Sequence, residues 1–233
     1  MSKDLCIVIA RGGSKRVPRK NIRHIAGRPL VAWPTAAATA SRLFQHVLIS
    51  TEDIEIAQAA QLAGAEYPFA RPIEVADDFS TTADVLRTVL QQWKAYSGNL
   101  PTFCCCLYGT SVFVNKDQLR SAKELLSTTE LVLAVSEYSH PIQRALKRSE
   151  EGDTDYIHPE FINTRTQDLE KSYHDIGLFY YFSVEAFLRH GGCSFGTLKK
   201  KSLIVPRTSA VDIDSEEDLA WANILAQYNG LGK

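Results

Sequence analysis

Four short, mostly apolar runs restrict the fold of this chain more than any other feature. They are Leu5–Ala10, His46–Ser50, Thr102–Tyr108 and Leu131–Ser136. Runs of this length without polar alternation are typical of strands buried on both faces, as in a parallel sheet. Helix-like segments separate the runs, which gives repeated strand–helix units. We therefore predict an α/β fold with a mostly parallel sheet covered by helices.

Sequence signals also mark the ends of the predicted helices. Thr81 and Asp84 have the spacing of a capping box, in which each side chain binds the other residue's backbone N–H. Gly64 follows a helical segment, at a position where glycine commonly ends a helix. Pro34 should lie near the first turn of its helix or produce a kink. The predicted helices cover residues 29–44, 53–63, 81–96 and 183–190, a segment beginning near 115, and residues 216–226.

The segment from 137 to 176 differs in texture from the rest of the chain. It is polar, contains the charged stretch Lys147–Asp155 and shows no strand–helix alternation. Regular patterns return with predicted strands at Gly177–Phe182 and Ser202–Val205. We therefore predict a single domain over residues 1–233, interrupted by an insertion at about 137–176.

Charge is distributed unevenly along the chain. The 26 Lys and Arg nearly balance the 27 Asp and Glu, for a net charge of −1. However, no acidic residue lies between Asp4 and Glu52, a stretch with eight basic residues, so the rest of the chain sums to −9. This composition excludes a disordered chain and a generally basic nucleic-acid binder.

Cysteine content and hydropathy indicate the compartment. The five Cys form no C-x-x-C pair and no zinc spacing, and Cys104–Cys106 lie in an apolar run, as small buried residues do. No apolar run approaches the ~18 residues that cross a bilayer, and Leu5–Ala10 lacks the flanks of a signal peptide. We expect a cytoplasmic protein without a membrane or nucleic-acid partner.

The segment Arg11–Asn21, R-G-G-S-K-R-V-P-R-K-N, directly follows the first predicted strand. Glycines let backbone N–H groups approach an anion closely, and the cations supply compensating charge. The segment matches neither a P-loop nor a Rossmann fingerprint. Its place at the carboxyl end of a strand favours phosphate binding. One alternative is a glycine turn whose cations are merely solvated. Another is a contact with nucleic acid, which the net negative charge of the rest of the chain disfavours.

This segment and the A-G-R-P-L that follows it resemble the signature of the acylneuraminate cytidylyltransferases (CMP-sialic acid synthetases). Further matches follow in order: I-S-T-E-D-I-E-I-A, G-A-E-Y-P-F-A-R-P, A-D-D-F-S-T-T and V-D-I-D-S-E-E-D-L. Within that family, P-I-Q-R-A-L, N-T-R-T-Q-D-L-E and Y-H-D-I-G-L-F-Y most resemble the pseudaminic acid cytidylyltransferase branch.

The resemblance implies a Rossmann-like nucleotidyltransferase fold and transfer of CMP from CTP to the anomeric hydroxyl of a nonulosonic acid, with release of pyrophosphate. Pseudaminic acid is the preferred acceptor. N-acetylneuraminic, legionaminic and 3-deoxy-manno-octulosonic acids remain open as alternatives. A catalytically silent nucleotide-binding regulator on the same fold is the alternative from another class.

The resemblance also implies roles for individual residues. Arg11 and Lys15 would act in catalysis with Asp212 and Asp214, and Arg71 would lie near the cytosine. The full set of implied nucleotide contacts is Arg11, Gly12, Gly13, Ser14, Lys15, Lys20, Asn21, Arg71, Ser80 and Thr81. Departures from the family pattern include Glu52 in place of Asp, and Gly109–Val112 in place of a proline-containing turn.

Asp212 and Asp214 are the candidate ligands for Mg²⁺. On a strand, residues two apart share a face, and two carboxylates opposite a triphosphate would make a hard oxygen site. Asp214 could instead cap the following helix, with Glu217 at the capping-box position. The resemblance favours the metal role, and both roles can coexist.

The insertion would serve a different purpose. By resemblance, residues 137–176 form a dimerisation arm that carries sugar-binding groups into the neighbouring subunit of a homodimer. An exposed loop with solvated charges is the alternative. Tyr180 and Tyr181, just beyond the insertion, are interpreted as packing residues. The candidate sugar-binding residues are Gln143, Arg144, Asn163, Arg165, Gln167 and His174.

Overall fold

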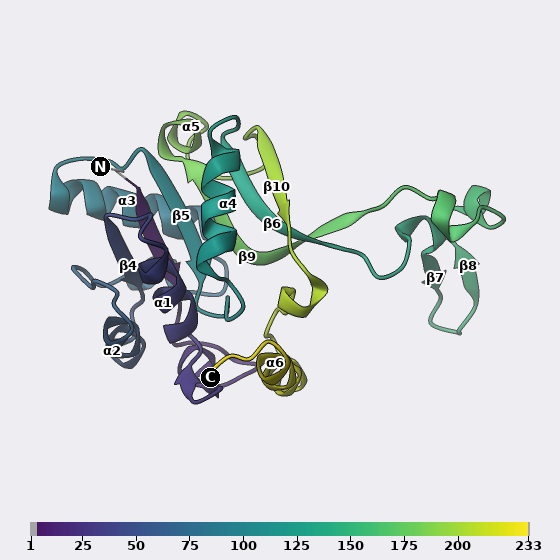
Figure 1. Cartoon of the computed structure of the whole chain (residues 1–233), viewed down its shortest axis with the longest axis horizontal. Coiled ribbons are helices and arrows are strands. Elements are labelled where there is room, and N and C mark those ends of the chain that lie inside the picture. The colour runs from purple at the N-terminus through teal and green to yellow at the C-terminus, as the bar shows by residue number, and fades with distance from the viewer. Residues whose placement is uncertain (1–3, 233) are drawn as a thin grey trace.

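A six-stranded sheet forms the centre of the protein, shown in Figure 1 as a computed structural model in which residues 4–232 are described. The strand order is β10-β6-β9-β5-β1-β4, and only β9 runs antiparallel to its neighbours within this sheet. The mostly parallel sheet predicted from the apolar runs is therefore confirmed. The strands are β1 (Leu5–Ile9), β4 (His46–Ser50), β5 (Phe103–Tyr108), β6 (Leu131–Glu137), β9 (Tyr173–Ser183) and β10 (Lys200–Ile204).

Helices cover both faces of the sheet, and one further helix packs beyond its carboxyl edge. The capping box of Thr81 and Asp84 is present at the start of α3, as predicted. Pro34 is the third residue of α1, in its first turn. The helices are α1 (Ala32–Ser41), α2 (Ile54–Leu62), α3 (Thr82–Ser97), α4 (Lys116–Leu126), α5 (Val184–Arg189) and α6 (Glu216–Tyr228), and two small hairpins pair β2 (His24–Ile25) with β3 (Arg28–Pro29) and β7 (Leu146–Arg148) with β8 (Thr154–Tyr156).

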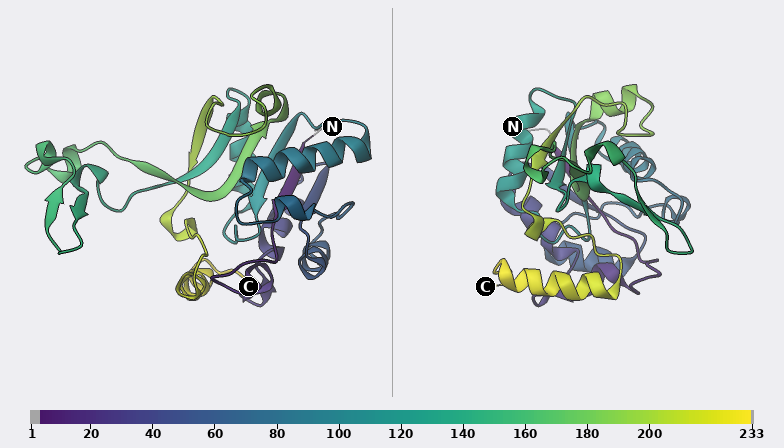
Figure 2. Two further views of the ribbon diagram at one scale, coloured as in Figure 1. Left: turned by 180° about the vertical axis from the view of Figure 1, so that it is seen from behind. Right: turned by 90° about the vertical axis from the view of Figure 1, so that its right-hand side faces the viewer.

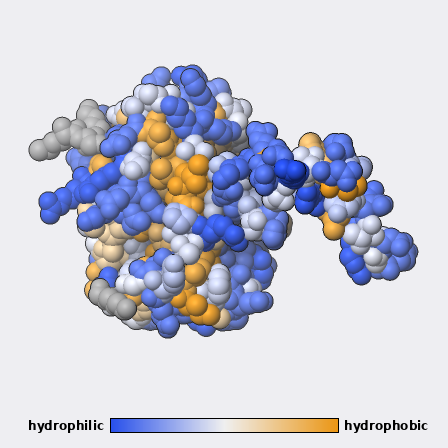
Figure 3. Space-filling model, turned by 45° about the vertical axis from the view of Figure 1, so that its right-hand side comes forward, coloured by the Kyte–Doolittle hydropathy of each residue, from blue (hydrophilic) through white to orange (hydrophobic). Residues whose placement is uncertain are grey.

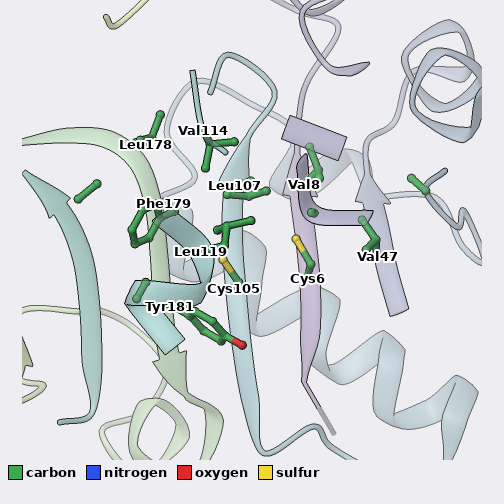
Figure 4. Close-up of a cluster of buried hydrophobic side chains, with 14 of the residues drawn as sticks. Cys6, Val8, Val47, Cys105, Leu107, Val114, Leu119, Leu178, Phe179 and Tyr181 are labelled. Atoms are coloured by element: carbon green, nitrogen blue, oxygen red, sulfur yellow. The ribbon is translucent and has the colours of Figure 1, made fainter. Parts of the chain in front are cut away.

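The core divides into one cluster on each face because successive side chains of a strand point to opposite sides. On one face, Cys6, Val8 and Cys105 pack with α1, α2 and α4 (Figure 4). On the other, Cys104 and Cys106 pack with α3 and α5. All five cysteines are free thiols, and the three adjacent ones are fully buried. The prediction that these three serve as small buried residues is confirmed.

A third apolar cluster lies beyond the carboxyl edge of the sheet. It joins Val17, Ile25 and Leu30, which follow the first strand, to Ile213 and to Leu219 on α6. These residues are almost 200 positions apart in the sequence. Their packing fixes the segment before α6 against the basic segment near the start of the chain.

Residues 138–172 leave the body of the protein as an extended arm that ends in the β7–β8 hairpin (Figures 1 and 2). The neck of the arm consists of the end of β6 and the start of β9, where Glu137 pairs with Tyr173 and Val135 with Asp175. The sequence pattern placed the return to the sheet at Gly177, but β9 begins at Tyr173. Residues 173–176 therefore belong to the sheet rather than to the insertion.

Apolar side chains are exposed along this arm. They lie among hydrophilic residues, as the space-filling view shows (Figure 3). The exposed apolar side chains of the arm are Tyr138, Ile142, Leu146, Tyr156, Ile157 and Ile162.

Within residues 4–232, none of the helices combines the length and the apolar character that crossing a bilayer requires.

Candidate active site

A cavity of about 220 Å³ opens at the carboxyl ends of β1 and β5. Ligands of open α/β sheets bind at this edge. A larger hollow of about 440 Å³ lies at the opposite edge, beside Asp4 and Trp93, and contains none of the predicted site residues. The polar lining of the carboxyl-edge cavity consists of Arg11, Lys20, Asn21, Arg71, Asp77, Asp78, Ser80, Thr82, Tyr108 and Thr110.

The basic segment is held in place by hydrogen bonds to its backbone. The N–H of Gly12 donates to Oε1 of Glu52 at 2.6 Å. The buried amide of Asn21 donates from Nδ2 to the carbonyl oxygen of Arg11 at 2.9 Å. A Cβ at Gly13 would meet no heavy atom within 4 Å, so this part of the loop faces open space. Side chains thus hold the loop at Arg11 and Gly12, and its backbone is open at Gly13, as a phosphate-binding backbone requires.

The cations of the segment bind carboxylates from three other parts of the chain. Asp78 contacts both Arg11 and Lys15, with N–O distances of 2.5 Å to each. These two partners, Lys15 first, hold the pKa of Asp78 below its ordinary value. Arg19 pairs with Asp53, the residue that caps α2.

Lys20 and Arg16 both bind Asp214, the candidate metal ligand from the far end of the chain. The Nζ of Lys20 lies 3.1 Å from Oδ1 of Asp214, and Nη2 of Arg16 lies 2.7 Å from Oδ2. Lys20 also donates to the carbonyl oxygen of Ile213 at 2.6 Å. Partial burial raises the pKa of Asp214, but the two cations outweigh burial, so that its pKa is lowered overall.

One expectation about the aspartates, the shared strand face, is wrong, and so is the alternative that Asp214 caps the last helix. Residues 211–214 form no strand, so Asp212 and Asp214 are not neighbours on a strand face. Asp214 is not the cap of α6 either, because Ser215 caps it in a box with Asp218. Oδ2 of Asp218 accepts the N–H groups of both Asp214 and Ser215, at 3.0 and 2.8 Å. The cap therefore begins one residue later than expected, and the side chain of Asp214 turns to the cations instead.

Asp212 lies close enough to Asp214 to respond to its charge. Burial, followed by the charge of Asp214, raises the pKa of Asp212 above its ordinary value. Among residues 4–232, no group of three or more His, Cys, Asp or Glu side chains is arranged to hold a metal ion. A cation here would need further oxygen ligands from a substrate.

Arg71 forms part of the cavity floor and is almost fully buried. Its Nε donates to Oγ of Ser50 at 3.1 Å, and its guanidinium also donates to the carbonyl oxygen of Ser50. Burial lowers the pKa of Arg71 to about 10, so the side chain still carries its charge at neutral pH. Ser80 also lines the cavity, whereas the hydroxyl of Thr81 is engaged in the cap of α3.

One residue of the cavity lining, Tyr108, is absent from the predicted site residues, and its neighbour Tyr180 was predicted only to pack. Tyr108 ends β5, and its hydroxyl lies 2.7 Å from Oγ1 of Thr82. Tyr180 packs edge-on against Tyr108 and donates its phenol proton to Asp175 at 2.6 Å. Tyr180 thus does more than pack, and Tyr181, which is fully buried as expected of a packing residue, also donates its phenol proton to Oδ2 of Asp4. The position of Tyr108 at the carboxyl end of a central strand is the signal that could have identified it.

Most of the predicted sugar-binding residues lie on the arm, away from the cavity of the same chain (Figure 1). Two of them make hydrogen bonds within the arm itself: Gln143 donates to the carbonyl oxygen of Glu170 at 3.0 Å, and Arg144 donates to that of Thr164. His174 lies in β9, at the neck, against the ring of Tyr138. Within one chain, the fold brings together the predicted phosphate-binding residues and Asp214, but not the arm.

The chain is similar in sequence to several known proteins. A family model described as cytidylyltransferase matches residues 5–188. The chain is 36% identical to the pseudaminic acid cytidylyltransferase of Campylobacter jejuni, over 97% of each protein. It is 30% identical to the CMP-N,N'-diacetyllegionaminic acid synthase of Legionella pneumophila, again over 97% of each.

A solved structure supports the fold independently. The CMP:2-keto-3-deoxy-manno-octonic acid synthetase complexed with CTP superposes with a TM-score of 0.70 at 14% identity, covering 98% of this chain and 100% of that one. The predicted nucleotidyltransferase fold is therefore confirmed.

Proposed function

The chain belongs to the cytidylyltransferase family, and from this premise we propose that it transfers CMP from CTP to the anomeric hydroxyl of pseudaminic acid. One observation carries the proposal. Arg11 and Lys20 line a single cavity, and Lys20 binds Asp214 from the opposite end of the chain. The proximity of Lys20 to Asp214 supports the proposal, because cations that would bind a triphosphate and a carboxylate that would bind its metal ion lie at one edge of the sheet.

In this proposal the chain contributes mainly position and charge. The anomeric hydroxyl oxygen attacks the α-phosphorus of CTP and gives up its proton to water. A new P–O bond forms, and pyrophosphate leaves with the electron pair of the P–O bond that breaks. Negative charge on the phosphates would be stabilised by Arg11 and Lys15, and by the N–H group of the loop at Gly13. Arg71 at the cavity floor would present its remaining donors to the nucleotide.

The carboxylates of Asp212 and Asp214 suit Mg²⁺ because this ion binds through one or two carboxylates together with phosphate oxygens and water. Lys20 and Arg16 at Asp214 are cations that such an ion would displace or accompany. A bound Mg²⁺ would offset charge on the triphosphate and orient it.

The choice of acceptor rests on the relatives. The protein that is 36% identical over nearly its whole length acts, by its name, on pseudaminic acid. The relative at 30% identity is named for a legionaminic acid product, which keeps that acid as the first alternative.

We propose further that the arm makes the protein a homodimer, in which the arm of one copy completes the sugar site of the other. A cytoplasmic location is consistent with five free thiols.

The test is a pyrophosphate-release assay with CTP and a panel of nonulosonic acids, run with Mg²⁺ and with a chelator. We expect release with pseudaminic acid that is fastest within the panel and depends on the metal. Faster release with another acid would reassign the acceptor. Binding of CTP without release for any acid would favour a catalytically silent regulator.

A further inference from the structure

Asp78 occupies a position that a substrate phosphate would be expected to take. Its two carboxylate oxygens bind two different cations, Oδ1 to Arg11 and Oδ2 to Lys15, each at 2.5 Å. The same residue lines the cavity, as does Arg11. A phosphate group presents its non-bridging oxygens to Arg and Lys in a similar way.

The turn that carries Asp78 is built to present it. The side chain of Asp77 accepts the N–H groups of Phe79 and Ser80, at 3.0 and 2.7 Å. Arg11 also donates to the carbonyl oxygen of Asp77 at 3.1 Å. Arg11 therefore binds both the backbone and the side chain of this turn, and the turn docks on the phosphate loop as a unit.

Binding of a polyanion to Arg11 and Lys15 while Asp78 stays in place would cost electrostatic free energy. A triphosphate bound to Arg11 and Lys15 would lie against the carboxylate, and like charges at contact distance repel each other. Breaking these ion pairs also costs little free energy, because the side chains are 37% (Arg11), 82% (Lys15) and 36% (Asp78) exposed. Solvent-exposed ion pairs of this kind contribute little free energy.

We propose that Asp78 is an internal competitor for the triphosphate of CTP. Its carboxylate holds Arg11 and Lys15 until the phosphates displace it, and the turn at 77–80 then moves away from the phosphate loop. Asp78 thereby weakens nucleotide binding and sets the affinity of the site. This inference rests on the proposed function, since it takes CTP as the ligand.

The experiment measures the dissociation constant of CTP by calorimetry, for the wild-type protein and for Asp78→Asn. The variant removes the charge but keeps the size and an oxygen. We expect it to bind CTP about two- to fivefold more tightly at low salt, which is the range that an exposed ion pair supports. The gain should shrink as salt rises, because salt screens the competing pair.

Glu74→Gln is the matched control. Glu74 lies in a short 3-10 helix of the same connection between α2 and α3, and its side chain makes no ion pair within residues 4–232. We expect its CTP affinity to stay close to that of the wild type, which would separate displacement of Asp78 from a general change in charge. Equal gains in both variants would overturn the inference.

The remaining outcomes are also distinct. Unchanged or weaker binding by Asp78→Asn would show that Asp78 orients the cations for the nucleotide, and would overturn the inference while leaving the proposed function intact. Failure of the wild-type protein to bind CTP would instead count against the proposed function itself. Asp78 is at the surface, so its substitution should leave the fold unchanged, which a thermal unfolding scan can verify.

Discussion

The missing side chain of Gly12 allows Asp53 to serve two structures at once. Asp53 accepts the N–H groups of Glu55 and Ile56, at 3.0 and 3.2 Å, and so caps α2. It also binds Arg19 of the basic segment. Burial raises its pKa, but Arg19 and the two N–H groups outweigh burial and lower it overall. One carboxylate thus ties the phosphate loop to a helix end.

Replacing Gly12 with Ala should disturb this arrangement. A Cβ at Gly12 would lie 2.5 Å from Oδ2 of Asp53, a distance too short for two non-bonded atoms. Because the cap of α2 restrains Asp53, the loop must move instead, and we expect the KM for CTP to rise roughly tenfold. In an Asp53→Ala background, the same substitution should have little further effect. Equal losses in both backgrounds would contradict the steric explanation.

Helix starts explain several features of the site at the scale of single elements. α2, α3 and α6 all begin at or beside a loop that lines or supports the cavity, and each has a side-chain cap. Such caps satisfy N–H groups that would otherwise lack partners in the first turn. They fix the positions at which the loops meet the helices. The cap therefore accounts for Thr81 more directly than a nucleotide contact does.

Thr81→Ala tests this distinction. Loss of the cap should lower the free energy of unfolding by about 1 kcal/mol, with the KM for CTP unchanged, and Thr81→Ser should retain most of the stability.

The Thr81 hydroxyl, more than any other group, holds the pKa of Asp84 below its ordinary value of 3.8. A carboxyl group with a lowered pKa stabilises the fold above pH 3.8, and this contribution is lost as the pH falls further. The difference between variant and wild type, measured by urea unfolding, should therefore shrink in that acid range.

At the scale of the whole molecule, the arm is too small to form a core that would bury its apolar side chains. Its two strands have three residues each, and all six are exposed. Exposed apolar surface of this kind is typical of sites of protein contact. A second copy of the chain is the partner that we propose, because most of the candidate sugar-binding residues lie on the arm, which extends away from the body of its own chain (Figure 2).

Mixing two inactive variants tests the arm. Lys15→Ala impairs the phosphate loop, and Arg165→Ala impairs the arm, so each alone should lose most of its activity. If the arm of one copy completes the site of the other, a mixed dimer contains one site with both parts intact, and activity should return to about a quarter of the wild-type value for random exchange. The wild-type mass in solution should be near twice 25.9 kDa. An active monomer, or no recovery on mixing, would contradict the shared site.

The sequence alone determined the features that depend on local pattern. The apolar runs predicted the buried strands, and the box of Thr81 and Asp84 predicted a helix start, because burial and capping are decided by residues a few positions apart. The basic segment predicted where anions would bind. The motifs of the family predicted the reaction class.

Only the tertiary structure decided which distant residues meet. Packing of Val17 and Leu30 against Leu219 brings Lys20 to Asp214, and no sequence pattern encodes that contact. Pairing with β6 extends β9 back to Tyr173, because a strand gains hydrogen bonds from a neighbour whatever its own hydropathy. The placement of Asp78 on Arg11 and Lys15 likewise depends on a turn more than 60 residues away from its partners. Long-range electrostatic and packing contacts are satisfied in three dimensions, so they can be found only after the chain has folded.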